Sequence, residues 1–123
     1  MQIMYEDDEK LKSIIHNAKI LNLNVNEIKV LYCINKAGEI TQRDIERQAD
    51  LRQPEVSLAI KQLSSIDMLK CDVTPSLVKG RPQNSYTMKK TMKDYFSAIK
   101  KQKENEWMMM KLALDDMDQQ FEE

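Results

Sequence analysis

The sequence predicts a mainly α-helical domain that carries one small β-hairpin. Apolar residues recur every three or four positions along most of the chain, and two short alternating segments lie close together after its midpoint. The chain also has only two glycines and three prolines, too few for the many tight turns of an all-β architecture. With 123 residues, it is long enough for one small domain with an appended element, and a domain of this size often gains stability by dimerising.

The N-terminal part predicts two helices. Residues 7–21 carry acidic residues in the first turn, where the helix dipole favours them. The inward positions of this helix are expected to be Leu11, Ile14, Ile15, Ala18 and Leu21. Asn24 or Asn26 is expected to cap the second helix, and Gly38 fits the left-handed position after its end. The inward positions of the second helix are expected to be Ile28, Leu31, Tyr32 and Ile34.

Residues 41–63, TQRDIERQADLRQPEVSLAIKQL, predict two short helices joined by a tight turn. Thr41 is placed to cap the first helix, with Ile45 and Ala49 facing inward and Leu51 filling the turn. A helix tolerates proline in its first turn, so Pro54 predicts that the second helix begins near Gln53. Its apolar residues follow one narrow stripe: Val56, Ala59, Ile60 and Leu63.

Residues 69–73 and 84–88 alternate in polarity and predict two antiparallel strands. The segment between them contains two prolines and one glycine and is therefore expected to be a loop. The pair Glu39-Ile40 is expected to form a short bridge to these strands. Because a two-stranded hairpin is not stable alone in water, it must pack on the helices. Two helices with a tight turn, followed by such a hairpin, make a winged helix-turn-helix.

Residues from 91 to about 120 contain no proline or glycine and predict a helix of roughly 30 residues, about 45 Å long. Its apolar stripe is too long for one small domain to cover, so a second copy of the helix is expected to cover it. The expected dimer contacts are Met92, Tyr95, Phe96, Ile99, Trp107, Met110, Leu114, Met117 and Phe121. The domain organisation is then an N-terminal helix with a dimer contact (1–23), a winged helix-turn-helix (24–90) and a C-terminal dimerisation helix (91–123).

The net charge of −1 conceals an asymmetry. Residues 24–103 hold 15 Lys/Arg and 9 Asp/Glu, a balance of +6, whereas residues 104–123 hold one lysine and seven acids, a balance of −6. Attraction to phosphate depends on the local field, so the basic part favours nucleic acid as a partner. The alternative reading is that both parts are only solvated surface.

The second helix of the pair presents a polar face that suits the major groove of DNA. If its apolar stripe faces the core, the residues that project outward include Gln53, Pro54, Ser57, Leu58 and Lys61. Glutamine can bond adenine through both its donor and its acceptor, serine can serve a base or a phosphate, and leucine can touch a thymine methyl. Lys61 suits a phosphate. An ordinary surface helix with a few polar groups is the alternative.

Further expected DNA contacts lie at the start of the first helix of the pair, in the turn and in the wing. Thr41, Gln42 and Arg43 lie where exposed N–H groups and a cation together suit a phosphate, and Arg52 in the turn suits one too. Lys79 and Arg81 flank Gly80 in the wing loop, where they would meet the backbone or a narrow minor groove. A solvated loop is the alternative for the wing.

Other chemistry has little basis in the sequence. Cys33 and Cys71 are 38 residues apart and the single histidine is His16, so no metal site or other cofactor is expected. Both cysteines are expected to be reduced core or half-buried residues. No catalytic motif is present, and we expect no enzyme. The chain has no apolar run long enough for a membrane span and no signal-peptide core at its start, so a cytoplasmic protein without a membrane partner is expected.

The segment IERQADLRQPEVSLAIKQL resembles the helix-turn-helix of winged-helix regulators of the MarR, ArsR and TrmB type, and looks most like that of small archaeal members. The following KGRPQNSYTM is similar to the wing of these regulators. The resemblance covers about residues 27–90 and implies a homodimeric transcription regulator that binds a roughly palindromic site. The chain departs from the pattern at Glu46, at Asp50 in place of the usual turn glycine, and at Leu58 where a polar reader is frequent. The paired cysteines of ArsR metal sensors are absent, so metal sensing is not implied.

The sequence therefore predicts a sequence-specific regulator that binds double-stranded DNA as a homodimer. Residues 53–66 would enter the major groove, and the wing, about residues 69–88, would lie on the backbone or minor groove. The alternative is a protein–protein interaction module in a transcription assembly, which the modest balance of +3 over residues 41–90 keeps open. A third reading is a repressor gated by a small-molecule effector in a pocket beside Trp107 and Tyr95. The Met-rich run from Trp107 to Met110 suits such a pocket, although packing at a dimer interface is the simpler account.

Overall fold

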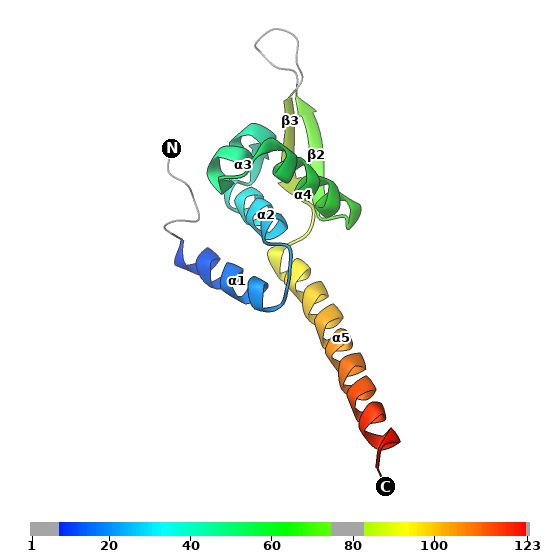
Figure 1. The fold of residues 1–123 in the computed structure, drawn as a ribbon. Helices are drawn as coiled ribbons and strands as arrows, with labels where there is room; N and C mark the ends of the chain where they lie inside the picture. The colour runs from blue at the N-terminus through cyan, green and yellow to red at the C-terminus, as the bar shows by residue number, and fades with distance from the viewer. Residues whose placement is uncertain (1–7, 75–82, 123) are drawn as a thin grey trace. The chain divides into compact units, whose positions relative to one another are not determined.

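The computed structural model describes residues 8–74 and 83–122. The chain divides into two compact units, with the boundary between Met92 and Lys93. The mainly α-helical fold with a small β-wing is confirmed, and every expected helix and strand is present (Figure 1). In chain order the elements are α1 (Glu9–Ile20), α2 (Val25–Ala37), β1 (Glu39–Thr41), α3 (Gln42–Ala49), α4 (Gln53–Ser65), β2 (Leu69–Thr74), β3 (Gln83–Met88) and α5 (Met92–Gln120). No helix among the described residues is long and apolar enough to cross a membrane.

Three helices begin at capping side chains, and two of these, Asn24 and Thr41, are among the caps that the sequence indicates. Leu11 N–H donates to Asp8 at 3.0 Å, Glu27 N–H donates to Asn24 at 3.2 Å, and Asp44 N–H donates to Thr41 at 3.3 Å. Each of these bonds satisfies an N–H group that has no partner inside its helix. Asn24 rather than Asn26 is thus the cap of α2.

Positive backbone angles end two of the helices. Gly38 follows α2 with a φ of 82°, which glycine adopts without steric cost. Asp50 follows α3 in the left-handed conformation, with a φ of 52° and a ψ of 51°. Aspartate tolerates this conformation better than most residues, so the turn between α3 and α4 forms without the usual glycine.

Helix α2 lies at the centre of the first unit. It packs against α1, α3, α4, β1 and β3. Ile28, Leu31 and Ile34 are buried as expected, and Val30 and Cys33 on a second face are buried too. One expectation was wrong at the end of α1, where Leu21 is 44% exposed and does not join the core.

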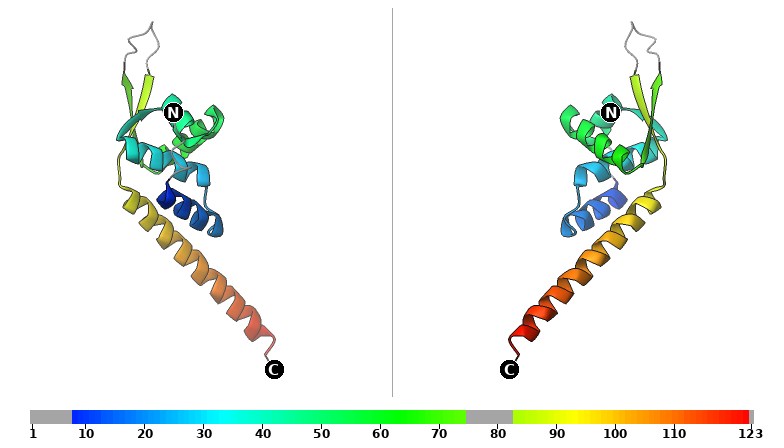
Figure 2. Two further views of the ribbon diagram at one scale, coloured as in Figure 1. Left: turned by 90° about the vertical axis from the view of Figure 1, so that its left-hand side faces the viewer. Right: turned by 90° about the vertical axis from the view of Figure 1, so that its right-hand side faces the viewer.

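The three strands form one antiparallel sheet in the order β1-β3-β2. Strand β1 pairs with β3 over three residues, more than the short bridge expected, and sets Thr41 opposite Ser85. The buried Ser85 hydroxyl donates to the Glu39 carboxylate at 2.7 Å, a second link between the same strands. Both views of Figure 2 show β2 and β3 side by side at one edge of the first unit. This pairing connects the wing strands to the residues that begin α3.

Asp8 joins α1 to α2 through one carboxylate. Besides capping α1, it accepts hydrogen bonds from the Tyr32 hydroxyl at 2.6 Å and from the Lys36 ammonium at 2.9 Å. These donors, with the Leu11 N–H, hold the pKa of Asp8 well below its ordinary value. Burial of the Tyr32 hydroxyl, and to a smaller extent the Asp8 carboxylate beside it, raises the pKa of Tyr32 to about 12.

We predict that Asp8→Asn lowers the thermal stability of the protein at neutral pH. A carboxylate whose pKa is depressed in the folded state stabilises the fold above its unfolded pKa, and this contribution is lost as the pH falls. The difference in melting temperature between wild type and variant should therefore be full at pH 7. It should begin to shrink below about pH 4, near the ordinary pKa of aspartate, and the two values should converge as the pH falls on through the depressed folded pKa. Asp115→Asn, at an exposed aspartate of α5, is the control and should show no such convergence. An equal deficit at all pH values would contradict an ionic role for Asp8.

The two cysteines differ in environment. Cys33 is fully buried, and burial, followed by the charge of Asp44, raises the pKa of its thiol to about 12. Cys71 on β2 is exposed, so the expectation that both cysteines are buried or half-buried was wrong for it. Strand alternation alone did not show which face of β2 the core would cover.

We predict that the folded protein has one reactive thiol. A thiol-specific disulfide reagent should modify Cys71 at once and Cys33 only after denaturation, because the thiolate is the reacting species and Cys33 is both buried and protonated. Cys71→Ser should abolish the fast reaction, and counting modified thiols by mass spectrometry checks it. Rapid modification of both thiols in native protein would contradict the burial of Cys33.

Candidate nucleic-acid interface

The candidate interface is the outward face of α4. Its apolar stripe is buried, with Val56 and Leu63 fully enclosed, and it packs on α2, α3 and β2. The opposite side is accordingly exposed, and Leu58 there keeps 53% of its surface accessible. The exposed residues on this side are Gln53, Pro54, Ser57, Leu58 and Lys61.

The N-terminus of α4 is held by residues that do not belong to this face. The Glu55 carboxylate accepts the Arg52 backbone N–H at 3.0 Å and the Asn26 side-chain amide of α2 at 3.3 Å. The Arg52 side chain is 90% exposed and lies 3.8 Å from Glu55, a weak surface ion pair. Gln53 takes no part in this anchoring, so its amide remains exposed at the end of the helix that would enter a groove.

A hydrogen bond connects the start of α3 to the middle of the outward face. The Gln42 side-chain amide donates to the Ser57 hydroxyl at 2.7 Å. The serine oxygen is thus an acceptor in this contact, and its own hydrogen is left to donate elsewhere. The bond brings together two residues that the sequence indicated separately.

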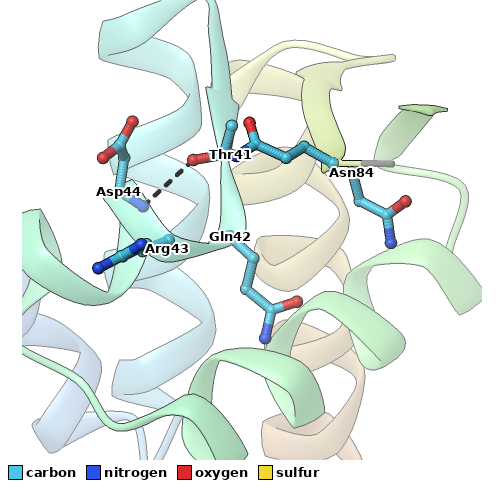
Figure 3. Close-up of a pocket in the computed structure, with 6 residues that line it drawn as sticks. Thr41, Gln42, Arg43, Asp44 and Asn84 are labelled. Atoms are coloured by element: carbon cyan, nitrogen blue, oxygen red, sulfur yellow. Dashed lines mark hydrogen bonds between the residues drawn. The ribbon is translucent and has the colours of Figure 1, made fainter. Parts of the chain in front are cut away.

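A shallow polar groove of about 300 Å³ lies at the start of α3 (Figure 3). It is lined by Thr41, Gln42, Arg43, Asp44, Gln83 and Asn84. The last two come from β3 and were not expected in the site from the sequence. The register of β1 on β3 is what places Asn84 beside Thr41, and alternation within β3 could not reveal that register.

Positive charge near α4 comes from separate elements. Arg43 at the start of α3 and Lys61 on α4 are both exposed. Arg47 is partly neutralised, because its guanidinium lies 3.8 Å from the Asp44 carboxylate. The wing residues Lys79 and Arg81 lie outside the described residues.

The expected dimer contacts on α5 differ in exposure. From Trp107 onward they are open, with exposed fractions of 62% for Trp107 and 88% for Phe121. Met92, Phe96 and Ile99 are half-buried. Tyr95 is only 7% exposed and its ring meets that of Phe96 edge-on at 5.4 Å, so it offers little surface to a second copy.

No protein-family model matches the sequence, and no curated protein is significantly similar to it. Solved structures do match the fold. A MarR family regulator from Neisseria meningitidis is 17% identical, with a TM-score of 0.54 over 89% of this chain and 85% of its own. A possible transcriptional regulator from Methanosarcina mazei Go1 is also 17% identical, with a TM-score of 0.54 over 86% of this chain and 85% of its own.

A third match is the structure of NadR in complex with 4-hydroxyphenylacetate, which is 12% identical. Its TM-score is 0.50 over 93% of this chain and 87% of that chain. At identities this low, the matches establish the fold only, and any function must be argued from the residues of the site. In fold, this chain is a winged helix of the type found in MarR regulators.

Proposed function

We propose that this protein is a transcription regulator that binds a specific double-stranded DNA sequence as a homodimer, with α4 in the major groove. The observation that carries the proposal is the division of α4 into a buried apolar stripe and an exposed face ending at Gln53. Such a helix, preceded by α3 and a tight turn, has the geometry in which the N-terminal residues of a recognition helix meet base edges. The proposed activity is binding, without a chemical step.

The exposed side chains of α4 suit different parts of the major groove. Gln53 can bond adenine at two atoms, and Leu58 suits a thymine methyl. Ser57 accepts a hydrogen bond from Gln42, so toward DNA it acts as a donor. Its partner would therefore be an acceptor, either a phosphate oxygen or an acceptor atom on a base edge.

The remaining contacts are proposed to the DNA backbone. Arg43 at the start of α3 and Lys61 on α4 are exposed cations, and Arg52 projects from the turn. The Thr41 oxygen accepts the Asp44 N–H, so its hydroxyl hydrogen can still be donated to a phosphate. The Gln42 amide nitrogen donates to Ser57, and its amide oxygen can still accept a hydrogen bond. Lys79 and Arg81 would add contacts from the wing.

The homodimer is proposed from the exposed apolar face in the second half of α5. A twofold pair would present two α4 helices to half-sites about one helical turn, roughly 34 Å, apart on one side of the duplex. Two recognition helices also multiply the affinity of one, because the second binds as an intramolecular step.

We predict that Lys61→Ala weakens binding to all DNA sequences alike. Loss of one phosphate contact should reduce the slope of log affinity against log salt by about 1 per protomer. The measurement is a titration of a DNA fragment from upstream of the protein's own gene at two salt concentrations, with random DNA as competitor. Lys19→Ala, at an exposed lysine of α1, is the matched control and should bind as wild type does.

Two outcomes of this titration would count against the proposal. Equal losses for the Lys61 and Lys19 variants would mean that only overall charge matters. Failure of the wild type to bind any DNA at low salt would make the interaction module the leading account.

We predict that Gln53→Ala reduces specificity rather than overall affinity. Loss of the Gln53 side chain should weaken binding to the preferred sequence by about 1–3 kcal/mol and leave binding to random DNA unchanged. Selection of bound sequences from a random pool should show one relaxed position per half-site. Gln119→Ala, at an exposed glutamine of α5, serves as control, and an unchanged selected sequence for the Gln53 variant would remove Gln53 from the reading face.

A further inference from the structure

The second half of α5 carries an apolar seam that the described part of the chain leaves uncovered. Its residues follow one another at alternating steps of three and four, the spacing of a two-stranded coiled coil. Their exposed fractions run from 62% to 88%, and they are Trp107, Met110, Leu114, Met117 and Phe121.

Toward the N-terminus, the next two positions with the same spacing are occupied by lysines. Lys100 and Lys103 occupy the two positions before Trp107. The Lys103 ammonium lies 3.2 Å from the Glu106 carboxylate, and the Lys103 side chain is only 28% exposed. A charged pair therefore interrupts the seam just before Trp107, so the uncovered apolar part begins at a defined residue.

We propose that this seam packs against the same seam of a second copy with the two α5 helices parallel and in register, so that each seam residue meets its own counterpart. The inference rests on the proposed homodimer and specifies its interface. In this arrangement all five apolar layers are complete. The like-charged layers at Lys100 and Lys103 then end the contact on its N-terminal side.

The antiparallel registers complete fewer layers. The seam alternates between two heptad positions: Trp107, Leu114 and Phe121 occupy one, and Met110 and Met117 occupy the other. In an antiparallel coiled coil each position faces the other kind, so Leu114 would face either Met110 or Met117 of the second copy. In the first case Phe121 falls opposite Lys103. In the second case the seam residues pair only as Leu114 with Met117 and Met110 with Phe121, so Trp107 has no seam residue opposite it. Each antiparallel register therefore leaves one large aromatic residue without an apolar partner, although burial of aromatic side chains contributes most to such an interface.

The charges beside the seam favour the parallel arrangement over the antiparallel register that keeps Trp107 in the seam. In parallel helices Glu106 of one copy flanks the seam opposite Lys111 of the other, and this pair occurs twice by symmetry. Lys111 is already at the seam edge, since its ammonium lies 5.7 Å from the centre of the Trp107 ring. The antiparallel register that keeps Trp107 buried instead sets Lys111 against Lys111.

Crosslinking distinguishes the orientations. In a Cys71→Ser background, where Cys33 is buried, Trp107→Cys and Phe121→Cys each introduce one accessible thiol. The two positions are about 21 Å apart along the helix, farther than a short bismaleimide spans. Parallel helices predict that each variant crosslinks with itself and that an equimolar mixture gives little mixed product. Crosslinking only in the mixture would overturn the parallel register.

A matched pair of methionine variants tests the seam itself. Met110→Lys should raise the dimer dissociation constant on the order of 100-fold, because it buries two unpaired charges. Met108→Lys is the control, since Met108 is 58% exposed, close to the 64% of Met110, but lies about 200° around the helix. Sedimentation should show a dimer for the control variant and dissociation for Met110→Lys, with equal helix content by circular dichroism.

The remaining outcomes are also decisive. A dimer that neither crosslinks at these positions nor responds to Met110→Lys would use another face and overturn the proposal. A monomeric wild type would overturn it as well, together with the homodimer. DNA binding through Lys61 and Gln53 is measured separately, so failure of the seam leaves the proposed DNA-binding face to be judged on its own result.

Discussion

The packing of the narrow apolar stripe of α4 against α2 is the contact on which the rest of the first unit depends. Val56 and Leu63 are fully enclosed in this contact, and Ile60 keeps only 7% of its surface. A helix whose stripe is this narrow has one stable rotation about its own axis, because a turn of 100° would expose the stripe and bury Lys61. The orientation of the outward face therefore follows from hydrophobic burial, without any contribution from the polar residues on that face.

Besides the Gln42–Ser57 bond, polar bonds hold α4 near its two ends. Glu55 ties the N-terminus to α2 and to the chain entering the helix, while Asn24 meets Gln62 near the other end at 3.4 Å. These bonds lie on the sides of the helix and are individually modest. Together with the buried stripe they hold the helix as a rigid element, which a reading surface requires if its side chains are to meet base edges at fixed positions.

Local signals in the sequence were enough to predict the helices, the turn and the Thr41 cap, and they narrowed the cap of α2 to Asn24 or Asn26. Asp50 stands where helix-turn-helix segments of the resembling regulators usually have a glycine, and it adopts the left-handed conformation of such a turn. Contacts between distant segments were harder to foresee. Nothing within β3 indicates that Asn84 will lie beside Thr41, because the register between β1 and β3 decides this. Val30 and Cys33 were missed for a related reason: a helix covered on two faces does not show the one-sided pattern used to find its core.

The bond between Gln42 and Ser57 has a consequence for how the proposed recognition surface can evolve. Gln53, Leu58 and Lys61 lie outside the core, so under the proposed function substitutions there would change the recognised sequence at little cost in stability. Ser57 is different, because its hydroxyl is shared with a residue of α3. A residue at position 57 without an acceptor atom leaves the Gln42 amide unpaired, so the effects of changes at the two positions should not add. Among homologues with altered specificity, positions 42 and 57 should therefore covary, whereas position 53 should vary independently.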